Sequence, residues 1–187
     1  LFTEMIPTKT LINSTKINLL IENNNQNPIA LQVGGSNYKE LEKCCKIVQN
    51  YNYDEINLNV GCPSKAVQKG SFGACLMENK ELVRACLETM QNASDIKVSI
   101  KCRIGLGNDH NYDYFSSFID EIVNNFRKPT SILILGLDNA GKTQVLYCMK
   151  LDHAITNTVP TLGFNLEEFK YKNLSIKAWD LGGQTKF

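Results

Sequence analysis

Short apolar runs that end in glycine alternate with amphipathic segments through about the first two thirds of this 187-residue chain. The runs "IALQVGG", "DEINLNVGCP" and "IKVSIKCRIG" predict buried strands followed by loops. The segments "YKELEKCCKIVQNY", "NKELVRACLETMQNA" and "YDYFSSFIDEIVNN" repeat apolar residues at i, i+3, i+4 and i+7, which predicts helices. Strands that alternate with helices of this length need crossover connections, so we expect an α/β fold with a parallel sheet.

Polar residues alternate with apolar ones in two of these predicted strands. Asn57 and Asn59 share one face of "EINLNV", and Ser99, Lys101 and Arg103 share one face of "KVSIKCR". Strands of a parallel sheet are normally covered on both faces and therefore almost wholly apolar. One interpretation is a sheet face open to solvent. The other is a partial TIM-barrel arc whose polar residues line a site at the carboxyl ends of the strands.

The pattern changes after a short polar stretch, residues 124–129. The run "SILILG" predicts a buried strand, "GLDNAGKT" a glycine-rich turn and "TQVLYCMKL" a short helix. The segment "NLEEFKYKNLSIKAWD" predicts a β-hairpin around its "KN" turn. We therefore expect two parts, residues 1–125 and residues 126–187, both of the α/β class.

Composition and charge argue against several classes of protein. A hydrophobic content of 43% allows a sizeable core, and no run approaches the ~18 apolar residues that span a membrane. The two parts carry 12 basic against 14 acidic residues and 8 against 5, and neither balance by itself indicates nucleic-acid binding. The seven cysteines form no C-x-x-C pair and no secretory segment precedes them. We therefore expect an intracellular protein, cytoplasmic or organellar, and not a secreted one.

Three long motifs of the first part occur in the order found in one enzyme family. With "ALQVGGS", "YDEINLNVGCPSKAVQKGSFGACLM" and "VSIKCRIG", residues 1–125 resemble the tRNA-dihydrouridine synthases, most of all their A-type members. The resemblance implies a TIM-barrel reductase that uses FMN and NADPH to saturate the C5–C6 bond of uridines in tRNA. It implies that Cys62 donates a proton to a uracil held by Asn59 and Arg103. It also implies that Gln32 and Lys101 contact the isoalloxazine of the flavin.

A cysteine suits the role of acid in such a reaction. Hydride reaches C6 of the uracil from the reduced flavin, and C5 must take a proton on the opposite face. A free thiol has a pKa of about 8.5, so it is mostly protonated at neutral pH. The alternative for Cys62 is an inert core residue, the commonest state of a free cysteine. The intact "NVGCPS" favours the acid, whereas Cys44, Cys45, Cys86 and Cys75 are expected to pack in the core.

The resemblance covers about half of a barrel. The family's first strand, its later strands, the loops that grip the FMN phosphate and the helical tRNA-binding domain find no counterpart in this sequence. The chain also opens on Leu1 rather than on methionine, so we expect sequence to be missing there. We predict that this chain alone does not retain FMN tightly.

The turn "GLDNAGKT" matches the phosphate-binding pattern G-x-x-x-x-G-K-[ST] in full. It follows a predicted strand and opens a predicted helix, as the pattern requires. Backbone N–H groups and the helix N-terminus then surround the phosphates, Lys142 reaches the β and γ oxygens, and Thr143 binds Mg²⁺. The expected nucleotide-binding residues are Gly136, Leu137, Asp138, Asn139, Ala140, Gly141, Lys142 and Thr143. The alternative is a plain glycine turn.

Two further motifs, "VPTLGFNLEEF" and "WDLGGQ", follow the glycine-rich turn. With them, residues 126–187 resemble the N-terminal part of an ADP-ribosylation-factor-like small GTPase. The resemblance implies that Thr161 meets Mg²⁺ and the γ-phosphate and that Asp180 is the Walker-B type acid. It implies that Gly183 donates its N–H to the γ-phosphate and that Gln184 orients the attacking water.

The implied ligands of this second part are GTP and Mg²⁺, and the implied partners are effector proteins. The family's guanine-reading segments find no counterpart, so the preference for GTP over ATP is implied by the resemblance alone. Its myristoylated N-terminal helix finds no counterpart either, so we expect no membrane attachment. The sequence leaves three functional hypotheses open. They are a dihydrouridine synthase fragment fused to a GTP-binding fragment, a GTPase switch, and a chimera with neither activity.

Overall fold

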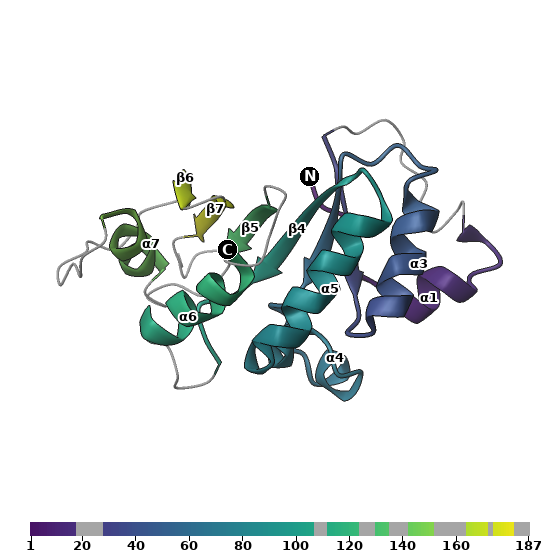
Figure 1. The fold of residues 1–187 in the computed structure, drawn as a ribbon, viewed down its shortest axis with the longest axis horizontal. Helices are drawn as coiled ribbons and strands as arrows, with labels where there is room; N and C mark the ends of the chain where they lie inside the picture. The colour runs from purple at the N-terminus through teal and green to yellow at the C-terminus, as the bar shows by residue number, and fades with distance from the viewer. Residues whose placement is uncertain are drawn as a thin grey trace. The chain divides into compact units, whose positions relative to one another are not determined.

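The computed structural model describes residues 1–17, 28–106, 112–123, 130–134, 142–151, 164–171 and 174–181. The chain divides into two compact units, Leu1–Ile100 and Lys101–Phe187. Figure 1 shows the elements of each unit along the chain. The boundary between these units, after Ile100, differs from the boundary after residue 125 that the sequence predicts between the two families of motifs. The boundary after residue 125 stays a prediction.

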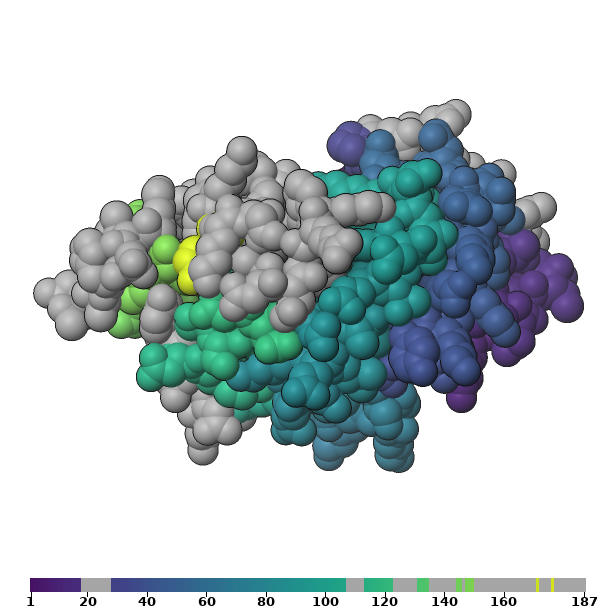
Figure 2. Space-filling view, viewed as in Figure 1, coloured from purple at the N-terminus to yellow at the C-terminus, as the bar shows by residue number. Residues whose placement is uncertain are grey.

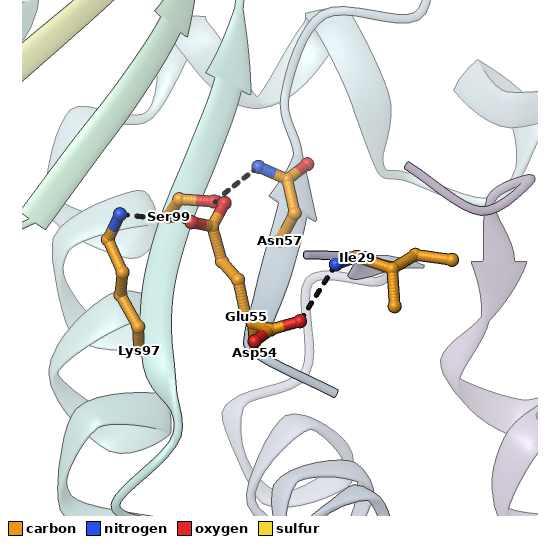
Figure 3. Close-up of polar contacts among 6 residues, drawn as sticks. All are labelled: Ile29, Asp54, Glu55, Asn57, Lys97 and Ser99. Atoms are coloured by element: carbon orange, nitrogen blue, oxygen red, sulfur yellow. Dashed lines mark hydrogen bonds and ion pairs between the residues drawn. The ribbon is translucent and has the colours of Figure 1, made fainter. Parts of the chain in front are cut away.

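The described part of the first unit contains a sheet in the order β1-β2-β3-β4. Its strands are β1 (Ile6–Pro7), β2 (Ala30–Gly34), β3 (Glu55–Asn59) and β4 (Lys97–Cys102). The last two residues of β4 belong to the second unit. β1 pairs with β2 in parallel, and so does β2 with β3. The arrows of β3 and β4 also point the same way (Figure 3). The predicted parallel sheet is therefore confirmed.

Helices follow each of these strands, which is the arrangement of a TIM-barrel arc. They are α1 (Thr8–Asn13), α3 (Tyr38–Val48), α4 (Lys65–Lys69), the 3-10 helix η1 (Gly73–Glu78) and α5 (Lys80–Ala93). The two longer helices begin at asparagine caps. Asn37 accepts hydrogen bonds from the first backbone amides of α3, and Asn79 accepts one from Leu82 N at 3.0 Å in α5. These caps satisfy amides that the helix itself leaves unpaired, so the sequence fixes where both helices start.

The core of the first unit is apolar and lies between the strands and the two longer helices. Its completely buried side chains include Leu31, Val33, Leu41, Cys44, Cys45, Val48, Ile56, Leu58, Val83, Cys86, Leu87, Met90 and Ile100. α3 and α5 contact each other, and their blue and teal surfaces adjoin in Figure 2. The helical faces predicted from the i, i+3, i+4, i+7 spacing are thus the buried ones.

Several short elements of the first unit carry no signal in the sequence. β1 contains two residues, too few to show a period, and α1 is a six-residue helix with a largely polar sequence. α4 lies within the "GCPSKAVQKGSFGACLM" segment and η1 ends one residue beyond it, and the sequence predicts no element in this stretch. Their positions depend on contacts with other parts of the fold, and local periodicity does not record such contacts.

The second unit has a smaller sheet in the order β5-β7-β6 in its described residues. Its elements are α6 (Tyr112–Val123), β5 (Thr130–Ile134), α7 (Lys142–Leu151), β6 (Phe164–Tyr171) and β7 (Leu174–Leu181). β5 and β7 are parallel, whereas β6 and β7 form an antiparallel hairpin. The hairpin predicted around "KN" is therefore confirmed, as is the α/β class of both units. No helix among the described residues is both long and apolar enough to cross a bilayer.

Candidate active site

Three amide side chains form a buried hydrogen-bonded group on the polar face of β2 and β3. The register of the parallel strands pairs Gln32 with Asn57, and Gln32 Nε2 donates to Asn57 Oδ1 at 2.9 Å. Asn59 Nδ2 donates in turn to Gln32 Oε1 at 2.7 Å. The three residues are between 0% and 3% exposed, so these bonds replace the water that the amides lose on folding. Gln32 is held further by its backbone amide, which donates to Thr3 Oγ1 at 3.0 Å.

The same face continues onto β4 and ends at an ion pair. Asn57 Nδ2 donates to Ser99 Oγ at 2.7 Å, and the Ser99 hydroxyl donates to the carboxylate of Glu55. Lys97 Nζ lies 3.2 Å from the second carboxylate oxygen of Glu55. Figure 3 shows these side chains reaching across from β3 to β4. The polar residues of the alternating strands therefore satisfy one another inside the first unit.

The loop after β3 carries Cys62, and two sets of contacts hold it. From the strand side, Asn59 Oδ1 accepts hydrogen bonds from Gly61 N at 3.1 Å and from Cys62 N at 3.0 Å. From the other side, Ala74 N donates to the carbonyl oxygen of Cys62 at 2.9 Å. Gly73 has φ = +78° and approaches so closely that a Cβ there would lie 2.7 Å from the same carbonyl oxygen. The backbone on both sides of Cys62 is thus fixed, while its side chain remains partly accessible.

The structure brings three of the predicted site residues of the first part together through these bonds. They are Gln32 in β2, Asn59 at the end of β3 and Cys62 three residues later. Lys101 lies in β4 and Arg103 follows that strand, and both are half-buried. These two residues fall in the second compact unit, so their placement beside Cys62 stays a prediction.

The other cysteines of the first unit differ from Cys62 in their surroundings. Cys44, Cys45 and Cys86 are fully buried on the helix faces, as predicted. Loss of water raises the pKa of the thiols to about 12 for Cys44 and Cys45 and to about 11 for Cys86. Burial also raises the pKa of Cys75, although this thiol is half-buried and donates to Phe72 O at 3.2 Å. Packing thus explains the three helical cysteines.

Sequence reasoning assigned no role to Asn57, Ser99, Glu55 or Thr3. The period-2 alternation of "EINLNV" and "KVSIKCR" was the available signal for the first three, because it places them on one polar face. It does not show which residue bonds to which, since that depends on the register between strands. Thr3 carries no signal, because it reaches Gln32 from outside any predicted strand.

The predicted nucleotide site lies mostly outside the described residues. The predicted site residues outside the described ranges are Gly136, Leu137, Asp138, Asn139, Ala140, Gly141, Thr161, Gly183 and Gln184. Within the description, Lys142 and Thr143 open α7, and Asp180 lies in β7. The parallel register pairs Ile134, the last residue of β5, with Ala178. Asp180 therefore lies two positions further along β7 than the partner of the last residue of β5. In the part of the chain that the structure describes, no group of three side chains is suited to a metal ion.

Comparisons with known proteins match the two parts of the chain separately. The family model described as dihydrouridine synthase matches residues 1–125, and that described as the ADP-ribosylation factor family matches residues 115–187. The two matches share residues 115–125, most of which belong to α6. The two parts of the chain thus match different family models, in the order that the sequence predicts.

The curated relatives described here match the first part of the chain. A tRNA-dihydrouridine(20/20a) synthase of Vibrio parahaemolyticus is 46% identical over 119 residues, which are 64% of this chain and 36% of that protein. Proteins of the same name from Shewanella oneidensis and Haemophilus ducreyi are 45% and 48% identical over 123 and 122 residues. The chain thus spans little more than a third of the length of these relatives. Through its residues 1–125, this chain belongs to the dihydrouridine synthase family.

Proposed function

We propose that the first part of the chain serves the flavin-dependent reduction of uridine in tRNA, with Cys62 as the proton donor. The observation that carries the proposal is the pair of hydrogen bonds from Gly61 N and Cys62 N to Asn59 Oδ1, because they fix the thiol-bearing loop to the end of β3. The names of the relatives support tRNA as the substrate. The carboxyl ends of parallel barrel strands are also where such enzymes place their reacting groups.

The residues present fit the isoalloxazine of FMN in their chemistry. Its pyrimidine edge carries a donor flanked by acceptors, and a primary amide offers both kinds of group. Gln32 provides such an amide from β2. Lys101 would supply a positive charge for the edge at N1 and O2, where negative charge gathers on reduction. Bound FMN would supply hydride to C6 of the uracil, and NADPH is the proposed source of that hydride.

The chain's own contribution to the reaction is a proton for C5. The S–H bond of Cys62 breaks as the new C5–H bond forms, and the sulfur keeps the electron pair as a thiolate. The partly accessible side chain then regains a proton from water. Asn59 and Arg103 hold the uracil in this proposal, with Asn59 acting at the same time on the Cys62 loop. Proton transfer from a positioned side chain contributes about 10²- to 10⁴-fold to a rate.

Turnover of tRNA that lacks dihydrouridine tests this function. The full chain is supplied with NADPH and an excess of free FMN, and dihydrouridine is detected by mass spectrometry as uridine that has gained two hydrogens. We expect Cys62→Ala to lower the rate by about 100-fold or more, because only the proton donor is removed. Cys75→Ala is the matched control and should retain the rate. Equal rates for wild type and Cys62→Ala would refute the role of Cys62.

A second function, nucleotide binding, is favoured by the fold of the second unit. The parallel pair of β5 and β7 and the helix α7, which begins at Lys142, flank the glycine-rich segment in the sequence and support the proposal, and Asp180 belongs to β7. We infer that Lys142, Thr143, Thr161 and Asp180 bind the phosphates and Mg²⁺ of GTP, with Gly183 and Gln184 acting on the γ-phosphate. The loop from Gly136 to Gly141 supplies backbone amides.

Binding of labelled nucleotide tests this second function. We expect GTP to bind in the presence of Mg²⁺, to be released by EDTA, and to be lost in Lys142→Ala but not in the control Lys150→Ala. Competition with unlabelled ATP shows whether the site prefers GTP or ATP. Binding of effector proteins is worth testing only if the site prefers GTP. Binding that survives Lys142→Ala would count against the proposal. A chain that fails both this assay and the turnover assay would be a fusion with neither activity.

A further inference from the structure

We propose that Glu55 and Ser99 are positioning residues, which set the orientation of Cys62 through a one-way relay of hydrogen bonds along the polar face of the sheet. The inference deepens the proposed function and rests on it, because the placement of Cys62 matters to catalysis only if its thiol reacts. Neither residue approaches the loop itself. Glu55 begins β3, whereas Cys62 follows the other end of that strand.

Every bond of the relay runs in the same direction. In order, the donors and acceptors are Cys62 N to Asn59 Oδ1, Asn59 Nδ2 to Gln32 Oε1, Gln32 Nε2 to Asn57 Oδ1, Asn57 Nδ2 to Ser99 Oγ, and Ser99 Oγ to Glu55 Oε1. Each amide thus accepts at its oxygen from the loop side and donates from its nitrogen toward Glu55. The relay passes from β3 to β2, back to β3, then to β4, and ends at Glu55 in β3.

The two ends of the relay decide this direction. A backbone N–H can only donate, and an ionised carboxylate can only accept. At the other end, Lys97 Nζ lies 3.2 Å from the Glu55 carboxylate and forms an ion pair with it. The Ser99 hydroxyl must then point its proton at Glu55, which leaves its lone pairs for Asn57. Asn57 must present its NH₂ group to Ser99 and its oxygen to Gln32, and the same constraint passes on to Asn59.

Burial makes the constraint effective. Asn57 is 0% exposed, Asn59 and Ser99 are each 2% exposed, and Gln32 is 3% exposed. An amide that turned over at such a depth would bring two donors or two acceptors face to face, without water to relieve the mismatch. The side chains of Glu55 and Lys97 are more accessible, at 17% and 48%. The charged end of the relay therefore lies near solvent, whereas the orientation that it imposes acts at the other end, on the Cys62 loop.

The relay acts on the loop through Asn59 alone, so the amides of Gly61 and Cys62 report on it. Their hydrogen exchange can be followed by NMR in the full chain without flavin or tRNA. Ser99→Ala removes the hydroxyl that links Asn57 to Glu55. We expect exchange at Gly61 and Cys62 to become about tenfold faster, which is what the loss of one typical hydrogen bond produces. The amide of Leu41, which donates to Asn37 O in α3, should be unchanged, because a merely structural loss would move it too.

Three further variants sharpen the test. Ser99→Thr keeps the hydroxyl and should restore the exchange of the wild type. Glu55→Gln keeps the shape of the side chain but places an NH₂ donor where the carboxylate could only accept. We therefore expect the hydrogen-exchange rates of the Gly61 and Cys62 amides to rise about threefold. This variant also decides the matter if Ser99→Ala does not fold. Glu42→Gln is the matched control, since it makes the same chemical change in an exposed ion pair with Lys46. It should leave both amides as they are.

The results separate this inference from the proposed function. If Ser99→Ala and Glu55→Gln fold and the amides of Gly61 and Cys62 exchange as in the wild type, the relay does not exist. If the amides respond but Cys62→Ala retains full turnover, the relay stands and the catalytic role of Cys62 fails.

Discussion

The side-chain oxygen of Asn59 lies 3.0 Å from the backbone nitrogen of Cys62 and accepts its hydrogen bond. An asparagine at the end of a buried strand thereby also directs the first residues of the following loop. Because the same oxygen accepts from Gly61 N, the loop leaves β3 with two of its amides satisfied inside the protein. The sequence spacing N-x-x-C in "NVGC" is therefore a structural unit, and several consequences can be measured.

Removal of the Asn59 side chain should cost stability. Asn59→Ala removes the acceptor of two half-buried backbone N–H groups and one buried donor to Gln32 Oε1. We expect the free energy of unfolding to fall by about 3 kcal/mol, measured by urea denaturation. Asn50→Ala is the control, because the amide of Asn50 is exposed at the end of α3, and it should cost about 0.5 kcal/mol or less. Equal losses in the two variants would contradict this role for Asn59.

Substitutions at Ser71, before η1, and at Gly73, its first residue, should change stability in opposite directions, although both residues have positive φ. Gly73 has φ = +78°, and a Cβ there would collide with Val67 Cγ1 and with Cys62 O. Gly73→Ala should therefore lower the free energy of unfolding by about 3 kcal/mol. Ser71 has φ = +57°, so Ser71→Gly relieves a strained backbone and should raise stability by about 0.5 kcal/mol. Thermal denaturation checks both, and a stabilising Gly73→Ala would show that the loop conformation is wrong.

Alkaline pH should destabilise the first unit through its buried thiols. Burial raises the pKa of Cys45 from 9.0 to about 12, so the unfolded state loses this proton first as pH rises. The stabilising effect is complete below about pH 9 and is lost progressively as pH rises from there through about 12. Between pH 8 and pH 10, one such thiol should account for about 1.4 kcal/mol of the loss in unfolding free energy.

The variant Cys45→Ala isolates this effect under reducing conditions. It should lose about 1.4 kcal/mol less than the wild type between the two pH values. Val48→Ala also removes a fully buried side chain from α3 but no titratable group, so it should show the wild-type loss. A Cys45→Ala variant with undiminished pH dependence would mean that the thiol ionises as readily in the folded chain as in the unfolded one.

The elements that the sequence predicts correctly are those with a long and regular pattern. α3 and α5 have apolar residues on one side over their whole length, and this spacing is a local signal. The β6–β7 hairpin was visible because its two strands flank a turn. β1 and α1 were missed because they are short, and β1 exists only by pairing with β2.

The candidate site shows the same division. Gln32, Asn59 and Cys62 were identified by motif, and the structure joins them by hydrogen bonds. Asn57 and Ser99 were recognised only as members of a polar face, because the register that links them is a property of three strands at once. A one-dimensional pattern contains the face of each residue but not its partner across the sheet.

Flavin titration of the full chain tests the central claim most directly, namely that the polar face and the Cys62 loop form a site for isoalloxazine. Flavin fluorescence should be quenched by wild type, and FMN should be lost on desalting. The dissociation constants of riboflavin and FMN should agree within about threefold, because the predicted contacts are with the ring and not with the phosphate. Lys101→Met should weaken binding about tenfold, whereas Lys46→Met should not. FMN binding that is unaffected by Lys101→Met, or the absence of any quenching in the wild type, would contradict the account.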